Sequence, residues 1–285
     1  MKILISGATG LIGSRLDRRL QQEGHSVSRL VRSKSDQRES DVLWGPSKGD
    51  IDRAGLEGFD AVVHLAGENI ASGRWTEEKK RRIRDSRVNG TRLLSEAVAG
   101  LESRPSVLVC ASATGYYGSR GDETLTEESP PGDNFLASVC QAWEAAADAA
   151  RDAGIRTVHA RFGMVLTPRG GALPKMLPPF KLGIAGHIGA GDQYMPWVAL
   201  EDVVGALVFL LTAESLSGPF NVTAPNPVTN EKFTKILGDV LSRPTVLAMP
   251  SFAAKLVFGD MADELLLASC RAVPRRLTES GYSFQ

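Results

Sequence analysis

Cysteine and histidine are scarce in this 285-residue sequence, and neither is clustered. The three cysteines, Cys110, Cys140 and Cys270, include no Cys-x-x-Cys pair, and the four histidines lack the spacing of zinc ligands. We therefore expect no metal site. An odd number of widely separated cysteines is typical of a reduced, cytoplasmic protein.

An excess of charge is also absent, because 33 Lys and Arg residues balance 33 Asp and Glu residues. Without a net positive field, the chain is not expected to bind nucleic acid or an anionic membrane. The densest basic stretch, residues 79–87, has helical spacing and is typical of a solvated helix face. No apolar run approaches the ~20 residues that span a bilayer. The strand-like start at Lys2 leaves no room for a signal segment, so we expect a cytoplasmic protein.

The first half of the chain contains a regular alternation of short β-branched runs and longer helical patterns. Strands are predicted at residues 2–6, 27–31, 60–65, 107–111 and 157–161, and a helix at residues 11–23. Right-handed crossovers return each strand parallel to the last. The alternation therefore predicts an α/β fold, a Rossmann-type doubly wound parallel sheet with helices on both faces.

The pattern changes after about residue 165. A segment rich in Gly and Pro is followed by a predicted helix at 201–212, a loop at 219–227 and an amphipathic helix at 230–241. We predict a Rossmann domain over residues 1–165, with 200–213 packing back on it, and a smaller mixed C-terminal lobe over 166–285. The cleft between the two is the expected ligand site.

Gly7, Gly10 and Gly13 lie between the first predicted strand and the first helix, in G-x-x-G-x-x-G spacing. In such turns, glycines permit the sharp bend, the approach of backbone N–H groups to a pyrophosphate, and close packing of helix and strand. A tight turn without a ligand is the alternative, but the strand-turn-helix context favours dinucleotide binding. The other cofactor contacts expected in this turn are Thr9, Leu11 and Ile12.

The end of the second strand distinguishes NAD from NADP. An NAD site usually has a carboxylate about 20 residues past the glycines, which binds the ribose 2′-hydroxyl. Here residues 31–34 read Val-Arg-Ser-Lys, and the first carboxylate is Asp36. The guanidinium of Arg32 can stack on adenine and pair with a 2′-phosphate. This favours NADP(H), although a merely solvated strand end would look the same.

Further segments resemble the extended short-chain dehydrogenase/reductase superfamily. More narrowly, they resemble its atypical, sugar-nucleotide epimerase-like subgroup, which has a small C-terminal domain of its own. The resemblance covers essentially the whole chain. The segments that carry it are 50–51, 60–70, 87–91 (RVNGT), 113–118 (ATGYYG), 135–137 with 143–144, 196–198, 221–225 with 227–230, and 243–244.

The resemblance implies further cofactor contacts. Leu65, Ala66 and Gly67 would flank the cofactor, although Leu65 and Ala66 would also be buried as ordinary strand residues. Arg87 would contact the cofactor, and Met164 would lie near its nicotinamide end. The resemblance also makes the helix around 79–88 and the helix after Asp133 candidates for pairing between subunits of a homodimer.

The usual catalytic pair of that superfamily is missing. Its members normally have a Tyr four residues before a Lys, and the lysine and cofactor lower the phenol pKa so that the tyrosine can transfer a proton. In the matching helix, Leu136 occupies the Tyr position and Cys140 the Lys position. No tyrosine in this chain has a lysine four residues further on.

Three residues are candidate catalytic substitutes. Ser112 could polarise a carbonyl or hold the nicotinamide amide. Tyr117, or its neighbour Tyr116, could reach the cleft or simply pack, and Glu68 could act as a base or cap the next segment. Cys140 has no visible base and is not expected to be a nucleophile. The candidate substrate contacts, which otherwise join the two lobes, are Lys175, Gln193 and Trp197.

Two functions stay open. One is an NADP(H)-dependent oxidoreductase or epimerase that acts on a small hydroxyl or carbonyl compound, such as a nucleotide sugar, with rearranged acid and base groups. The other is an inactive NADP(H)-binding regulatory or interaction protein, since members of the resembling group include cell-division inhibitors. The missing Tyr and Lys favour the second function.

Overall fold

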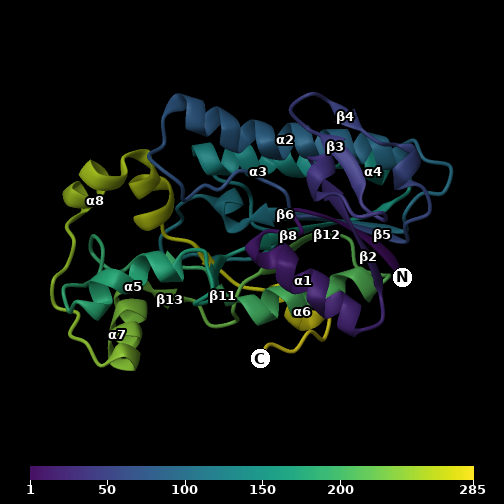
Figure 1. The fold of residues 1–285 in the computed structure, drawn as a ribbon. Coiled ribbons are helices and arrows are strands. Elements are labelled where there is room, and N and C mark those ends of the chain that lie inside the picture. Colours follow the sequence, from purple (N-terminus) through teal and green to yellow (C-terminus); the bar gives the residue numbers. More distant parts are fainter.

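A computed structural model describes all residues 1–285 as an α/β protein with one large sheet (Figure 1). Its parallel strands are β1 (Lys2–Ser6), β2 (Ser26–Val31), β3 (Val42–Gly45), β5 (Ala61–His64), β6 (Val107–Ala113), β8 (Arg156–Phe162) and β12 (Gly218–Val222). The order across the sheet is β12-β8-β6-β5-β1-β2-β3, and β4 (Asp50–Ile51) pairs antiparallel with β3. The strand order reverses between β1 and β5, where doubly wound sheets bind ligands at the carboxyl ends of their strands. The predicted fold class is confirmed.

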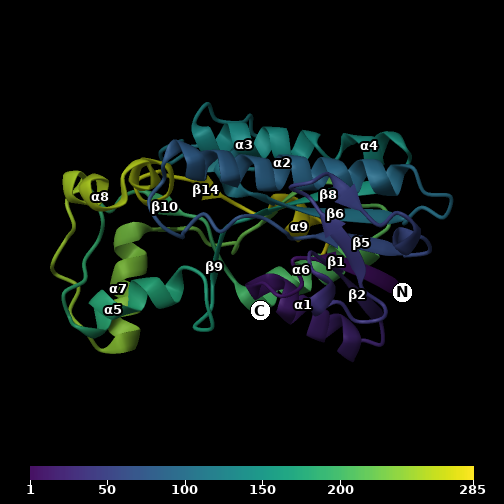
Figure 2. The same cartoon turned by 45° about the horizontal axis from the view of Figure 1, so that its top comes forward.

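Helices cover both faces of the sheet (Figure 2). One face carries α1 (Leu11–Gln22) and α6 (Leu200–Thr212), and the other carries α2 (Glu77–Ala99), α3 (Phe135–Ala145) and α4 (Asp148–Asp152). Along β6, Val107 and Val109 pack into the first layer, and Leu108 and Cys110 pack into the second. Burial on both faces explains why this strand is apolar throughout rather than alternating.

The loop predicted at 219–227 is wrong in its first part, because residues 218–222 form β12, the edge strand that pairs with β8. Residues 223–227 lie outside the helices and strands, as predicted. Pro219 made the segment look like a loop. At an edge, the outer side of a strand needs no N–H donor, so proline is tolerated there. The side chains of Phe220 and Val222 are fully buried in the main core.

The smaller lobe extends from one end of the sheet, at the left of Figure 1. It contains α5 (Leu173–Lys181), α7 (Asn230–Leu241), α8 (Ser251–Phe258), the π-helical turn η4 (Ala262–Leu266) and three short strand pairs. The pairs are β9 (Met164–Leu166) with β11 (Trp197–Ala199), β10 (Tyr194–Met195) with β13 (Val228–Thr229), and β7 (Thr124–Leu125) with β14 (Arg271–Ala272).

The chain passes between the two parts more than once. The chain leaves the lobe to form α6, which packs against α1. It returns to the large sheet again at α9 (Arg275–Glu279), which packs against β12. Three short 3-10 turns, η1 (Lys34–Asp36), η2 (Ala54–Leu56) and η3 (Thr114–Tyr117), complete the structure. No helix has both the length and the hydropathy that a membrane span requires.

Candidate functional site

The glycine turn joins β1 to α1 with almost no space for side chains. Gly7 has φ +68°, and a Cβ there would lie 2.9 Å from backbone atoms of Leu65 and Ala66. A Cβ at Gly13 would lie 2.3 Å from the carbonyl oxygen of Gly7. Gly10 is the N-cap of α1 and has no side chain to bond the first amides of the helix. The turn therefore presents free N–H groups at an exposed surface, as a phosphate requires.

Ser6 fixes the segment beside this turn. Its hydroxyl oxygen accepts hydrogen bonds from the N–H groups of Leu65 and Ala66, at 3.1 and 3.2 Å, and lies 2.6 Å from Nδ1 of His64. Because this oxygen already accepts two hydrogen bonds, the Ser6 hydroxyl donates its own hydrogen bond to Nδ1 of His64. Nδ1 is then an acceptor, so the imidazole proton is on Nε2. Nε2 is buried without a hydrogen-bond partner, and the ring meets Trp44 edge-on at 5.8 Å.

His64 should make stability depend on pH. Burial lowers its pKa from 6.5 to about 4, so between these values the unfolded chain binds the proton and the folded chain does not. The contribution of neutral His64 to the free energy of unfolding is fully present above pH 6.5 and is lost as the pH falls toward 4. We expect the free energy of unfolding to drop by about 2 kcal/mol between pH 7 and pH 5 from this group.

Denaturant titrations at pH 5, 6 and 7 measure this effect. The variant His64→Gln should be less stable at pH 7 but should show a weaker fall toward pH 5. His187→Gln, at a half-buried histidine, is the matched control and should keep the wild-type dependence. Parallel pH curves for the wild type and His64→Gln would contradict the prediction.

Arg32 directly follows β2, and its exposed side chain makes no hydrogen bond or ion pair within the chain. The nearby carboxylate of Asp41 is already occupied, because it accepts hydrogen bonds from the backbone N–H and guanidinium of Arg29. Arg32 thus offers an unpaired guanidinium beside the expected adenosine position.

Arg87, on α2, has a more buried cation. Its Nη1 donates to the carbonyl oxygens of Glu68 and Ile83, both at 3.1 Å, and its guanidinium lies 5.0 Å from the centre of the Trp143 ring. Burial lowers its pKa, and no carboxylate pairs with it. Since a Cβ at Gly67 would lie 3.5 Å from Cζ of Arg87, the guanidinium lies directly behind the predicted cofactor segment. Met164, in β9, is half-buried.

Ser112 and Tyr117 belong to one buried network centred on Arg161. Ser112 donates to Glu144 at 2.6 Å, and Glu144 holds Arg161 through two hydrogen bonds of 2.8 Å. Tyr117 donates to Asn221 at 2.7 Å and accepts from Arg161 at 3.0 Å. Burial raises the pKa of Tyr117 to about 12. These contacts favour a structural role, tying α3 and β6 to β8 and β12.

Glu68 is engaged with Lys79, whose ammonium lies 2.6 Å from its carboxylate. The buried ammonium also donates to Asn69 and Ser72, and so holds the loop after β5 against α2. The hydrogen bond from Lys79 lowers the pKa of Glu68, which makes this carboxylate a weaker base.

Apolar packing surrounds Leu136, the residue that the sequence resemblance matches to the superfamily tyrosine. Leu136 is buried against Trp75 and Ile83. A Cβ added at Gly115 would lie 3.2 Å from the Cβ of Leu136. Burial raises the pKa of Cys140 to about 12, so its thiol stays neutral. All three cysteines are buried and free, and no three His, Cys, Asp or Glu side chains gather where they could hold a metal ion.

The three predicted substrate contacts lie in different surroundings. Lys175, on α5, donates to the carbonyl oxygen of Ala71 at 2.6 Å and so bridges the lobe and the loop after β5. Gln193 is buried and donates to two backbone carbonyls of the lobe, and the indole N–H of Trp197 donates to the carbonyl of Asn226. Lys175 is the most exposed of the three.

A contact at the start of α3 could not be predicted from the sequence. The carboxylate of Glu264, in η4, accepts hydrogen bonds from the N–H groups of Phe135 and Leu136, at 3.2 and 3.1 Å. Glu264 lies 128 and 129 positions further along the chain than these two residues, so no local sequence pattern predicts the contact. The C-terminal segment therefore caps the start of α3.

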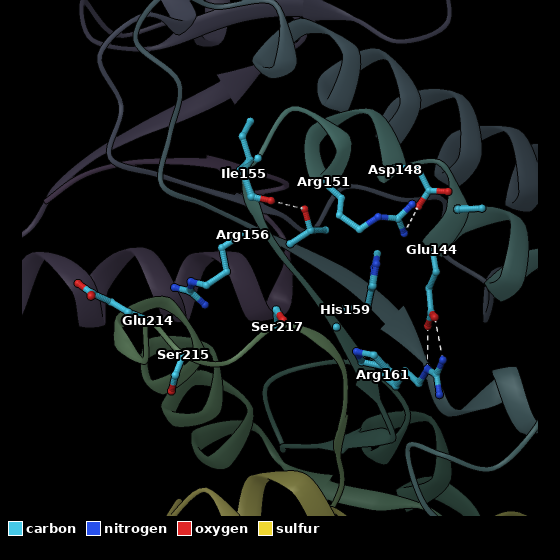
Figure 3. Close-up of a pocket in the computed structure, with 15 residues that line it drawn as sticks. Glu144, Asp148, Arg151, Ile155, Arg156, His159, Arg161, Glu214, Ser215 and Ser217 are labelled. Carbon is cyan, nitrogen blue, oxygen red and sulfur yellow. Dashed lines mark hydrogen bonds and ion pairs between the residues drawn. The ribbon is translucent and has the colours of Figure 1, made fainter.

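A groove of about 830 Å³ lies between α4 and the ends of β8 and β12 (Figure 3). Its charges are mostly paired within the chain, as Glu144 with Arg161 and Asp148 with Arg151. It extends to Ile155 and Gly218, at the amino ends of these strands, whereas Gly7 follows the carboxyl end of β1. In parallel α/β sheets the cofactor binds at the carboxyl ends, so this groove is not the dinucleotide site.

The sheet order and the glycine turn define a Rossmann-type nucleotide-binding protein. Residues 3–223 match the NAD dependent epimerase/dehydratase family, and residues 249–285 match a domain of unknown function, DUF1731. The chain belongs to this epimerase family and carries the DUF1731 domain, which confirms the resemblance drawn from its sequence.

Relatives match over essentially the whole of this chain. The chain is 44% identical over 282 residues to the Epimerase family protein Mb2239 of Mycobacterium bovis. The aligned residues cover 99% of this chain and 93% of that protein. The crystal structure of the human epimerase family protein SDR39U1 with NADPH aligns with a TM-score of 0.90 and 34% identity, over 100% and 95% of the two chains. The structure of a nucleoside-diphosphate sugar epimerase from Corynebacterium glutamicum aligns with a TM-score of 0.83 and 37% identity, over all of this chain but 55% of that one.

Proposed function

We propose that this protein binds NADP(H) in preference to NAD(H) and catalyses a nicotinamide-dependent reaction on a small hydroxyl or carbonyl compound. The unpaired guanidinium of Arg32 carries the cofactor preference, because Arg32 follows β2 directly and β2 pairs with β1, the strand that leads into the glycine turn. The NADPH in the structure of the human relative supports it. A nucleotide sugar is the substrate class suggested by the name of the Corynebacterium protein.

In this proposal, the first amides of α1 bind the pyrophosphate and Arg32 binds the 2′-phosphate. Leu65, Ala66 and Gly67 line the cofactor, with Arg87 behind them, and the turn at Ser6 fixes their position. The bound nicotinamide would supply the hydride chemistry. A group other than a Tyr–Lys pair must transfer the proton. The hydroxyl of Tyr116, unlike that of its neighbour Tyr117, makes no hydrogen bond within the chain. The ring of Tyr116 lies on the guanidinium of Arg161, at 3.5 Å.

Replacing Arg32 by alanine should reduce the affinity for NADPH by roughly tenfold to a hundredfold, because a charge-assisted contact to phosphate is lost. The affinity for NADH should hardly change. Fluorescence titration of the reduced cofactors measures both values. Arg38→Ala, at an exposed arginine of the same region, is the control for a general loss of charge. Equal affinities of the wild type for NADPH and NADH would refute the proposed preference.

The engagement of Ser112, Tyr117 and Glu68 in internal contacts favours a second function, an inactive NADP(H)-binding regulatory protein. A panel of carbonyl compounds and nucleotide sugars with NADPH separates the two. Turnover that is lost in Tyr116→Phe, with cofactor affinity unchanged, supports the enzyme. Cofactor binding without turnover across the panel supports the regulatory protein.

A further inference from the structure

Residues 167–171, Thr-Pro-Arg-Gly-Gly, lie directly on the start of α1, and we call them the strap. A Cβ at either Gly170 or Gly171 would lie 3.2 Å from a methyl carbon of Leu11. Gly171 has φ +75°, which favours glycine. The strap therefore reaches from the end of β9, in the second half of the chain, to the glycine turn in the first.

The strap and the glycine turn line one cavity of about 340 Å³. Thr9, Gly10 and Ser14 line it from the side of α1, and Arg169 and Gly170 line it from the strap. Thr9 and Gly10 are exposed in the present structure. A ligand that occupies this cavity would contact both segments at once.

Three arginines line the cavity, and their hydrogen bonds distinguish them. Arg15 is held by Glu201 through two contacts of 3.0 and 3.1 Å, and Arg18 donates from Nε to the carbonyl oxygen of Ser14. The guanidinium of Arg169 is exposed and donates no hydrogen bond within the chain. Arg169 therefore has all five N–H donors available for an anion beside the free amides of α1.

We propose that the strap covers the pyrophosphate of the bound dinucleotide and that Arg169 binds this pyrophosphate from the side opposite α1. The proposal rests on the proposed function, because it requires a dinucleotide at the glycine turn. A guanidinium and a helix N-terminus on two sides of the diphosphate would neutralise much of its charge. Arg32 reads the 2′-phosphate that only NADP carries, whereas Arg169 binds a group that NAD and NADP share.

The variant Arg169→Ala tests this assignment in fluorescence titrations with NADPH and NADH. Both affinities should fall by roughly tenfold to a hundredfold, and their ratio should stay at the wild-type value. Arg169→Lys should keep part of the affinity. Arg81→Ala, which removes an exposed charge from α2, is the matched control and should bind like the wild type.

The outcomes separate the two proposals. If the wild type binds neither dinucleotide, the proposed function fails and the strap assignment fails with it. If the wild type binds and Arg169→Ala keeps both affinities, only the strap assignment fails. A loss confined to NADPH would also overturn it, because Arg169 would then read the 2′-phosphate.

Limited proteolysis gives a readout that is independent of activity. Trypsin can cleave after the exposed Arg169, and saturating NADPH or NADH should slow this cleavage by at least about tenfold. Cleavage after Lys181, at the exposed end of α5, is the internal reference and should change little. Equal rates at Arg169 with and without cofactor would overturn the proposal.

Discussion

Replacing Gly13 by alanine is expected to destabilise the protein and to remove most of its cofactor affinity. The new methyl group would lie 2.3 Å from the carbonyl oxygen of Gly7 and 2.8 Å from Cα of Ala8, and neither backbone atom can move alone. Helix α1 or the turn must shift, at a cost of about 3 kcal/mol. The shift also displaces the amides that bind phosphate, so the affinity for NADPH should fall by more than about thirtyfold.

Gly10→Ala is the matched control within the same turn. Gly10 has φ −74°, which alanine adopts readily, and its Cβ would lie 3.2 Å from the Gly7 oxygen. Its effect on stability should be under about 1 kcal/mol. Thermal unfolding of both variants makes the comparison, and NADPH titration of Gly13→Ala measures its loss of affinity. Equal losses of stability in the two variants would show that the tight contact at Gly13 is not the cause.

Breaking the buried pair of Glu144 and Arg161 is the second change with a large expected effect. The variant Glu144→Gln leaves the guanidinium of Arg161 buried without a carboxylate and deprives Ser112 of an ionised acceptor. Burial by itself would lower the pKa of Arg161, but the carboxylate of Glu144 raises it overall. We expect the free energy of unfolding to fall by about 3 to 5 kcal/mol.

An exposed ion pair nearby provides the comparison. Arg151 and Asp148 lie 2.8 Å apart on α4, where their side chains are 59% and 42% exposed, so Asp148→Asn should cost under about 1 kcal/mol. The double variant Glu144→Leu with Arg161→Met should be more stable than Glu144→Gln, because it buries no unpaired charge. Denaturant unfolding measures all three. A loss below 1 kcal/mol in Glu144→Gln would contradict the structural role assigned to the network.

Local patterns in the sequence were sufficient for most of the sheet. β1 and α7 have the predicted limits, and β2, β5, β6, β8, α1 and α6 differ by one or two residues. Their signals are the β-branched runs and the apolar helical spacing, which depend on neighbours within one element. β12 was missed because it contains Pro219, and a proline normally indicates a loop. A proline is tolerated in a strand at the edge of a sheet, and the sequence alone did not show that β12 lies there.

The roles of the candidate catalytic residues could not be predicted as well, because each role depends on hydrogen-bond partners that are distant in the sequence. Ser112 looks like an available hydroxyl in the sequence, but its hydroxyl donates a hydrogen bond to Glu144, 32 residues away. Tyr117 is bound by Asn221, 104 residues further along the chain. A buried polar group must find a hydrogen-bond partner, and only the packed structure decides which one.

The sequence by itself determined the doubly wound fold and the glycine turn, because strand alternation and glycine spacing act over short stretches of chain. The tertiary structure decided which polar groups are free for a ligand. It commits Ser112, Tyr117 and Glu68 to internal partners and leaves Arg32 and Arg169 without one. These outcomes depend on which distant segments the fold brings within hydrogen-bond distance, and no local pattern encodes that.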